Sequence, residues 1–322
     1  IVACGVVFNA DNDFFIGQYD PAGHLNWAMS YDTPGFNDYC YGVATDGSGN
    51  VFVAGYVDKG TDADALAVKY NSSGVLQWAE PLDSGVDERW CAAATDAAGN
   101  VYLTGMYDDL AGASLILAAS YDTSGPPPAL RWSGTYVISG NETGRAVTVS
   151  SSGDLYIAGD NVWDVRVFQL DPSDGSEILQ GTYAGFAQLN VVGGMAVDSS
   201  GNVLVSGFTY DLLFPVTQYD LRLIVFDSGL NVVWTDTHDH ETQMDGFGFP
   251  VAASKVGTDG AGNSYLSGQV GWNECYTDRD LFARQYDPTM TESWSQVHDS
   301  APPQMDVTGI ASDDAGTCTS EE

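Results

Sequence analysis

Residues Val197–Phe208 read VDSSGNVLVSGF, and this stretch decides the fold. A short apolar run leads into a turn written with Asp, Gly and Asn, and an alternating run follows and ends at Gly207. This pattern is typical of a β-hairpin. The stretches Asp46–Gly55, Asp96–Gly105 and Asp259–Gly268 repeat it closely, and looser copies begin at residues 150 and 313. The copies begin about every 48 to 61 residues, which indicates a repeat architecture.

A second motif alternates with this hairpin. An apolar run ends in an aromatic residue or Leu, Asp or Asn follows with a turn, and a further apolar run usually closes on Trp. Six copies occur, at Phe15–Trp27, Leu66–Trp78, Leu117–Trp132, Val165–Leu179, Leu221–Trp234 and Leu281–Trp294. Each unit is therefore two hairpins, or four strands that we call a to d, which is the strand count of one propeller blade.

The sequence thus predicts an all-β, six-bladed β-propeller with four-stranded blades, formed by one domain over residues 1–322. The blades are expected at 307–322 with 1–27, 40–78, 90–132, 145–179, 192–234 and 250–294. Ile1–Gly5 aligns with strand b and Val307–Ser312 with strand a, so we expect the terminal segments to share one blade, close the ring and remove its open edges. The Trp that ends strand d is expected to fill the space between neighbouring blades.

The amino-acid composition supports this fold and limits the classes of molecule that the protein can bind. The 322 residues include 37 Gly and 12 Pro, and 44 acids against 10 Lys and Arg leave a net charge of −34. Such a charge makes nucleic acid and anionic membranes poor partners, and no apolar run long enough for membrane insertion occurs. The acids either form a solvated surface suited to a salty medium or collect divalent cations. Five Cys and few Lys favour an extracellular or cell-surface location.

The run Gly194–Pro215 resembles the SBBP-type β-propeller repeat of exported bacterial and archaeal proteins. The resemblance is carried by Gly194, Asp198, Gly201, Asn202, Gly207, Phe208, Thr209, Phe214 and Pro215. It implies a propeller and an exported setting, and it brings no catalytic residues to transfer. That family is usually described as seven-bladed, whereas this sequence shows six blades.

Acidic residues gather in the loops between strands b and c, which share one face with the loops between strands d and a. Asp11 and Asp13 lie in a stretch, NADND, that weakly resembles a calcium turn, so calcium is the cofactor that these loops suggest. An acid recurs six residues before the end of strand c, at Asp13, Asp64, Asp164, Asp220 and Asp280. Such recurrence is more typical of a strand-entry residue than of a metal ligand.

Two other groups of residues are candidate sites. His238 and His240 form a His-x-His pair whose rings would lie on one side of a strand and could bind a metal, although the repeat places His238 as a packing residue of strand d. Aromatic residues in the same loops are candidate platforms for a glycan: Trp163, Tyr210, Phe214, Trp272 and Tyr276. The sequence contains none of the common nucleophile, phosphate-loop or zinc motifs.

Cysteines and sequons give further expectations for an exported protein. Their places in neighbouring blades predict the disulfides Cys40–Cys91 and Cys4–Cys275, with Cys318 left to bond another chain. Asn71 and Asn141 lie in glycosylation sequons.

Two functions remain open on the sequence alone. The first is a non-enzymatic extracellular scaffold that assembles with like subunits into a polymer or another homo-oligomer, as in a surface layer or filament. The second is a module that binds, and in one version hydrolyses, a glycan, or that binds calcium through its acidic, aromatic loops.

Overall fold

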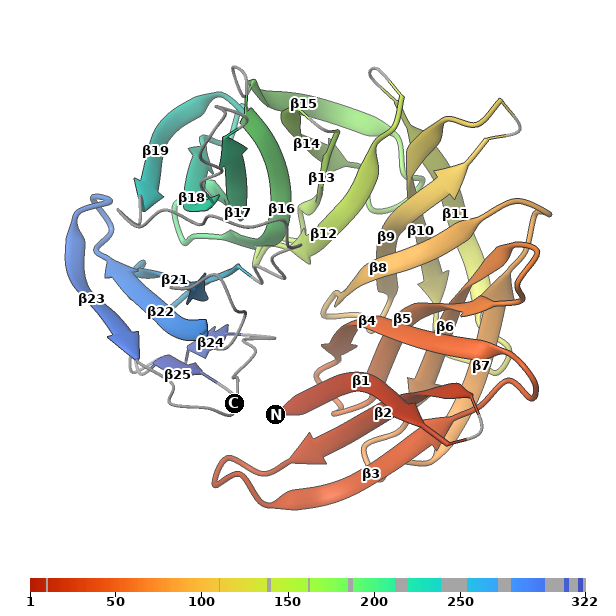
Figure 1. Cartoon of the computed structure of the whole chain (residues 1–322). Helices are drawn as coiled ribbons and strands as arrows, with labels where there is room; N and C mark the ends of the chain where they lie inside the picture. Colours follow the sequence, from red (N-terminus) through yellow and green to blue (C-terminus); the bar gives the residue numbers. More distant parts are fainter. Residues whose placement is uncertain are drawn as a thin grey trace. The chain divides into compact units, whose positions relative to one another are not determined.

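The fold is seen in a computed structural model that describes residues 1–9, 11–109, 111–137, 140–161, 163–184, 188–211, 219–238, 254–271, 279–298, 310–312 and 318–320. Every regular element in these ranges is a β-strand (Figure 1). These ranges contain no helix with the length and apolar character needed to cross a membrane.

The strands form successive sheets in chain order. The first sheet has three strands: β1 (Val2–Phe8), β2 (Asn12–Tyr19) and β3 (Leu25–Tyr31). The second and third have four strands each: β4 (Asn37–Thr45), β5 (Val51–Asp58), β6 (Ala63–Tyr70), β7 (Leu76–Leu82), β8 (Glu88–Thr95), β9 (Val101–Asp108), β10 (Ser114–Asp122) and β11 (Ala129–Tyr136). Their neighbouring strands pair antiparallel.

Three more four-stranded sheets and a hairpin follow. Their strands are β12 (Thr143–Val149), β13 (Leu155–Asp160), β14 (Asp164–Leu170), β15 (Glu177–Ala184), β16 (Gln188–Val197), β17 (Val203–Asp211), β18 (Tyr219–Phe226), β19 (Val232–His238), β20 (Lys255–Thr258), β21 (Ser264–Gly271), β22 (Arg279–Tyr286), β23 (Glu292–His298), β24 (Ile310–Ser312) and β25 (Cys318–Ser320). Each of the five blades expected within residues 40–294 is thus a four-stranded sheet with its strands in the order a, b, c, d, whereas β1–β3 and the β24–β25 hairpin, which were expected to share one blade, form separate sheets.

The chain divides into two compact units, and the division runs through the fourth sheet. The first unit comprises Ile1–Ile157 with Gln169–Ile178, and the second comprises Ala158–Phe168 with Leu179–Glu322. In the first sheet β1 pairs with β2, and the C-terminal strand β24 pairs with β25. Ring closure through a shared terminal blade, and a single domain, therefore stay predictions.

The turn between strands a and b explains why the first motif folds as it does. In the second sheet the Asp46 carboxylate accepts hydrogen bonds from the backbone N–H groups of Ser48 and Asn50, at 2.9 Å each, and from Asn50 Nδ2 at 2.7 Å. Gly49 has a φ of 77°, a conformation that favours glycine. Asp96, Asp198 and Asp259 make the same contacts in their sheets. The Asp and Asn of the repeat therefore stabilise a turn, as the sequence predicts.

The Trp of the second motif joins neighbouring sheets. Trp27 of β3 donates a hydrogen bond from Nε1 to the Ser72 carbonyl in the c–d turn of the next sheet, at 3.2 Å. A Cβ added at Gly74 in that turn would lie 2.7 Å from the Trp27 ring. The interblade role is confirmed, but the expected strand end is wrong, because strand d begins two residues before Trp27 and continues to Tyr31.

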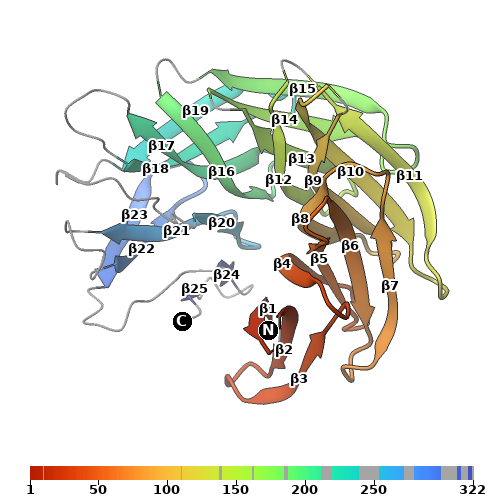
Figure 2. The same cartoon turned by 45° about the vertical axis from the view of Figure 1, so that its right-hand side comes forward.

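The core of each unit lies between its sheets. In the first unit, strands of the second and third sheets contribute Phe52, Trp78, Trp90, Leu103 and Leu117 to one buried cluster. The first strands of these two sheets, β4 and β8, lie side by side, as the two views show (Figures 1 and 2). In the second unit a cluster joins the fifth and sixth sheets in the same way through Leu204, Leu223, Leu266 and Phe282.

Candidate functional site

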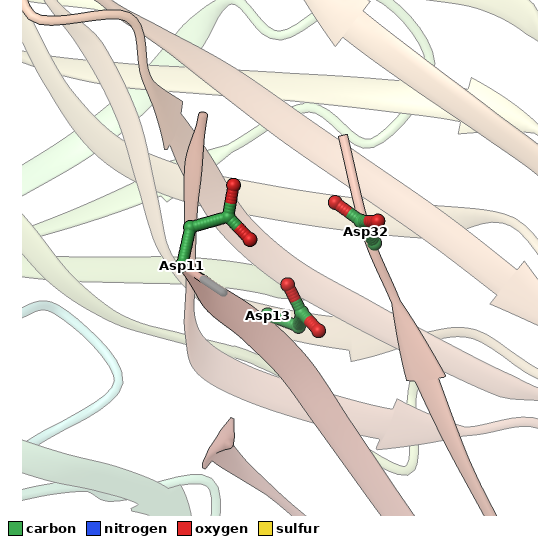
Figure 3. Close-up of side chains that lie close together, drawn as sticks. All are labelled: Asp11, Asp13 and Asp32. Atoms are coloured by element: carbon green, nitrogen blue, oxygen red, sulfur yellow. The ribbon is translucent and has the colours of Figure 1, made fainter. Parts of the chain in front are cut away.

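Three carboxylates converge at the end of the first sheet where strand c begins and strand d ends. Asp11 precedes β2, Asp13 is its second residue, and Asp32 directly follows β3. One carboxylate oxygen from each lies within 4.8 Å of the others, and the side chains point toward one another (Figure 3). The antiparallel register explains the meeting, because Phe14 pairs with Tyr31 and so places Asp13 beside Asp32. We call these residues the first acidic cluster.

Asp13 is the buried member of this cluster. Its side chain is only 3% exposed. Asn9 Nδ2 donates a hydrogen bond to Oδ2 at 2.5 Å, whereas Oδ1 is buried and accepts no hydrogen bond. Among the described ion pairs, none involves Asp11, Asp13 or Asp32. A buried carboxylate without compensating charge is costly, so the first acidic cluster has the electrostatics of a cation site.

The loop from strand d to the next strand a is held by a second buried carboxylate. Asp38 is fully buried and accepts hydrogen bonds from Thr33 N at 2.6 Å and Thr33 Oγ1 at 2.9 Å. Burial, with the nearby charges of Asp32 and Asp13, raises the pKa of Asp38 to about 6 against these hydrogen bonds. Partial desolvation and the carboxylates of Asp13 and Asp11 also raise the pKa of Asp32. Negative charge is therefore in excess throughout this corner of the sheet.

The second sheet contains a matching group, formed by Asp62, Asp64 and Asp83, which we call the second acidic cluster. Its carboxylate oxygens also lie within 4.8 Å of one another. Here, however, Lys59 Nζ contacts Asp64 Oδ2 and lies 3.2 Å from Asp83 Oδ2. Hydrogen bonds and charge from Asp64 and Asp83 raise the pKa of Lys59. This cluster is thus balanced in part by a cation of the protein itself.

The third sheet shows that the fold does not require these acids. Leu115 pairs with Tyr107, as Asp13 pairs with Val7, so Leu115 occupies the position of Asp13. The position of Asp32, directly after strand d, is occupied by Val137. Because leucine and valine occupy these two positions in the third sheet, strand c can begin there without an acid. The third sheet shows no more than this, and the strand-entry role of Asp13 stays a prediction.

An aromatic stack borders the first acidic cluster. The ring of Tyr56 stacks on Tyr39 and on Tyr41, with centroids 5.1 and 5.7 Å apart, and the Arg89 guanidinium lies 4.8 Å from the Tyr56 centroid. Asn12 Nδ2 donates a hydrogen bond to the Tyr39 hydroxyl at 3.0 Å. Because Asn12 stands between Asp11 and Asp13, this hydrogen bond links the stack to the cluster.

Of the candidate glycan platform, the structure describes only the Trp163 side chain. Trp163 is 47% exposed, and its backbone N–H donates a hydrogen bond to Asn161 Oδ1 at 2.9 Å. Tyr210 lies in β17, and its side chain is outside the described part of the structure. Phe214, Trp272 and Tyr276 lie outside the described residues altogether. The glycan platform stays a prediction.

His238 packs as the repeat predicts. Its ring stacks on Phe282 at a centroid distance of 4.2 Å, and its Nδ1 lies 2.9 Å from Arg284 Nη2. A guanidinium at this nitrogen repels a metal ion and takes the lone pair that would bind it. His240 lies outside the described residues.

The disulfide pairing differs from the prediction. Cys4 of β1 bonds to Cys40 of β4, with Cα atoms 6.2 Å apart. Cys40 therefore cannot bond to Cys91, and Cys4 cannot bond to Cys275, which itself lies outside the described residues. The physical reason is the register: Cys40 pairs with Gly55, a place that Trp90 takes opposite Gly105 in the third sheet, so Cys91 is one residue out of step with Cys40, whereas β1 lies against β4 and brings Cys4 to Cys40. Cys318 lies in β25, and its bonding stays a prediction.

Both sequon asparagines lie in turns. Asn71 Oδ1 accepts hydrogen bonds from the backbone N–H groups of Ser73 and Val75 at 3.0 and 2.9 Å. Asn141 is exposed and has a φ of 59°. Glycosylation at either residue stays a prediction.

The sequence identified Asp11 and Asp13 but missed Asp32 and Lys59. The sequence did contain a signal, because an acid directly follows the last residue of strand d in each of the first two sheets, at Asp32 and Asp83. The predicted end of strand d at Trp27 concealed it, since the strand must run on to Tyr31 before Asp32 comes beside Asp13.

Comparisons with known proteins agree with the repeat and the fold. Residues 33–56 match the family model of the SBBP β-propeller repeat. This segment includes the Asp46–Gly55 copy of the hairpin, whereas the resemblance in the sequence was clearest at Gly194–Pro215. Curated proteins give no match.

Solved structures resemble the chain over most of its length. A protein of unknown function from Bacteroides caccae is 13% identical, with a TM-score of 0.54, over 92% of this chain and 93% of that one. The Dos1 propeller is 12% identical, also with a TM-score of 0.54, over 96% and 72% of the two chains. A protein of unknown function from Dyadobacter fermentans is 10% identical, again at 0.54, over 87% of each chain. The chain therefore has a β-propeller fold, and its residues 33–56 match the SBBP-type repeat.

Proposed function

We propose that this chain is an extracellular, non-enzymatic β-propeller module that binds a divalent cation, calcium by preference, through Asp11, Asp13 and Asp32. One observation carries the proposal. Asp13 is 3% exposed, Oδ1 of its carboxylate accepts no hydrogen bond, and this carboxylate lies beside two others. Near a protein surface, two like charges about 4 Å apart repel by roughly 4 kcal/mol, so a bound dication would remove a large cost.

The donor atoms favour calcium. Carboxylate oxygens are hard ligands, and Ca²⁺ takes six to eight of them at about 2.3–2.6 Å, so two ligands on opposite sides of one ion are about 4.6–5.2 Å apart. Oxygens within 4.8 Å of one another can therefore share a calcium ion. The smaller Mg²⁺, with bonds of about 2.0–2.1 Å, demands near-ideal octahedral geometry and dehydrates reluctantly, so three side chains at the ends of two strands suit it less well than the adaptable Ca²⁺.

Calorimetry tests this proposal. Protein freed of metal by EDTA and gel filtration is titrated with CaCl₂, and in parallel with MgCl₂. We expect saturable calcium binding that Asp13→Asn and Asp32→Asn each weaken strongly, because each removes one anionic ligand. Glu177→Gln is the matched control, since it removes one exposed carboxylate far along the sequence from the cluster. Calcium binding that is absent, or that survives in both Asp variants, would contradict the proposal.

A second function, assembly with like subunits, is supported by the outer strands. Strand d is the edge of each four-stranded sheet. Several of these strands expose large apolar side chains at their start, for example Leu76 at 46%, Ile178 at 53% and Val233 at 56%. Exposed apolar edge strands favour pairing with other chains.

Assembly can be followed by light scattering and negative-stain microscopy. We expect ordered oligomers or polymers that Val233→Lys weakens, because a charge on an edge strand opposes pairing. Ser228→Lys is the control, since it adds the same charge at an exposed turn without removing apolar surface. A monodisperse monomer at high protein concentration, with and without calcium, would exclude this function.

A further inference from the structure

The two acidic clusters correspond residue by residue. Asp13 pairs with Val7, and Asp64 pairs with Val57, so both acids hold the same place in strand c. Phe14 pairs with Tyr31, and Ala65 pairs with Leu82, so Asp32 and Asp83 both directly follow strand d. Both buried members are 3% exposed.

The support around the clusters is repeated as well. In the first, Thr33 Oγ1 donates a hydrogen bond to the buried Asp38. In the second, Ser84 Oγ donates to the buried Glu88. The backbone N–H at the start of strand c is bound in both, by Asn37 Oδ1 at 3.1 Å and by Asp87 Oδ1 at 2.9 Å. The two clusters are thus two copies of one arrangement.

The copies differ at the residue that follows strand b. In the first sheet this residue is Asn9, a neutral amide that donates to Asp13 Oδ2. In the second sheet it is Lys59, whose ammonium contacts the equivalent Asp64 Oδ2 and reaches Asp83. The Lys59 backbone N–H also bonds to the Asp62 carbonyl at 3.0 Å, which fixes the loop that carries it.

We infer that Lys59 is a tethered cation that takes, in the second acidic cluster, the place of the divalent ion bound by the first, so that the residue after strand b decides which cluster binds an ion. This inference rests on the proposed function. The ammonium lies on the two Oδ2 atoms that an ion would use, so an ion could enter only by displacing Lys59. Oδ1 of Asp64 accepts no hydrogen bond, as in Asp13, but the ammonium on Oδ2 balances the charge of the same carboxylate.

Position 9 lacks such a charge. Asn9 leaves the three carboxylates of the first cluster with a formal charge of −3, whereas Lys59 reduces the charge of the second cluster to −2, since −3 + 1 = −2. A neutral side chain at this position keeps the charge that attracts an ion, and its amide can be displaced from Asp13 Oδ2 without separating two opposite charges. Asn9 and Lys59 are therefore the specificity-determining residues of the two clusters.

Exchanging the two residues tests the inference. Calcium stoichiometry is measured by calorimetry for the natural chain, Asn9→Lys, Lys59→Asn and the double exchange. We expect the two clusters together to bind one calcium ion in the natural chain, none in Asn9→Lys, two in Lys59→Asn and one in the double exchange. In the double exchange, calcium binding should depend on Asp64 and no longer on Asp13. Asp64→Asn and Asp13→Asn, each added to the double exchange, test this: only Asp64→Asn should abolish binding.

The outcomes separate this inference from the proposed function. A natural chain without calcium binding sensitive to Asp13→Asn refutes the proposed function. A natural chain that binds as proposed, together with a Lys59→Asn chain that gains no ion, refutes the inference alone. Stability gives a second readout, because Lys59→Asn should lower the unfolding midpoint in EDTA and calcium should restore it. A Lys59→Asn chain that stays unfolded at every calcium concentration also contradicts the inference, since the ion should replace the ammonium.

Discussion

Replacing Asp38 with Asn should stabilise the protein, and the gain should grow as the pH rises. The pKa of Asp38 is about 6 in the folded chain against an ordinary value of 3.8, mainly because the side chain is buried. A raised pKa means that the folded state holds the proton more tightly than the unfolded state. The protonated form therefore stabilises fully below pH 3.8, and the contribution is lost as the pH rises through 6.

The size of the effect follows from these two pKa values. Ionised Asp38 costs about 1.6 kcal/mol at pH 5 and about 3 kcal/mol at pH 8 relative to the protonated form. Asn stays neutral, and it can accept from Thr33 N while its amide donates to Thr33 Oγ1. The gap in unfolding free energy between Asp38→Asn and the natural chain should therefore widen by about 1.4 kcal/mol from pH 5 to pH 8.

Urea denaturation in EDTA at pH 5, 6, 7 and 8 measures this gap above the isoelectric point of about 4.1. Asp96→Asn is a control of opposite sign. Burial alone would raise the pKa of Asp96, but hydrogen bonds from Asn100, Tyr102 and Ala98 outweigh burial and lower it. That variant should lose stability by an amount that is constant over this pH range. A gap for Asp38→Asn that does not change with pH, or a less stable Asp38→Asn at pH 8, would refute the reasoning.

Three further predictions follow from the first unit. Gly74→Ala should lower the unfolding free energy by about 2–4 kcal/mol in urea denaturation, because the φ of Gly74 is 76° and the added Cβ would lie 2.7 Å from the Trp27 ring. Gly60→Ala is the control: its φ is 77° but no atom lies within 4 Å of the added Cβ, so the loss should be only about 1–2 kcal/mol. Mass spectrometry of a non-reduced digest should find Cys4 linked to Cys40, and Cys40→Ser should lower stability by about 2–5 kcal/mol; free thiols at both residues would contradict the pairing. Calcium affinity measured from pH 7 to pH 5 should fall with decreasing pH, because desolvation and the neighbouring carboxylates raise the pKa of Asp32 and its protonation removes one ligand; an affinity that does not change would contradict binding through Asp32.

The hairpins were predictable because their turns are coded locally. Asp46, Gly49 and Asn50 form the a–b turn through their own hydrogen bonds and backbone conformation, so each copy of the motif is sufficient to predict its hairpin. The end of strand d is different. Beyond Trp27 the strand continues because its backbone pairs with β2, and the apolar pattern of the sequence does not record that pairing.

Only part of the candidate site could be predicted from the sequence, again because strand pairing is not recorded in the local pattern. Asp11 and Asp13 stand together in the sequence, but Asp32 reaches them only through the pairing of β2 with β3. The disulfide needed information of a longer range still, because it depends on how β4 of one sheet packs beside β1 of another. Local turn chemistry is readable from a single repeat, whereas contacts across strands and sheets require the register.

The Cys4–Cys40 bond also determines how the first sheet would carry mechanical load. A pulling force applied near Ile1 would pass through the disulfide into β4 and bypass the chain between the two cysteines, which are 36 residues apart in sequence. Extended, such a segment spans about 120 Å, and this length would be released only after reduction of the bond. Under such a force, β1–β3 would thus be protected from unravelling by a covalent link.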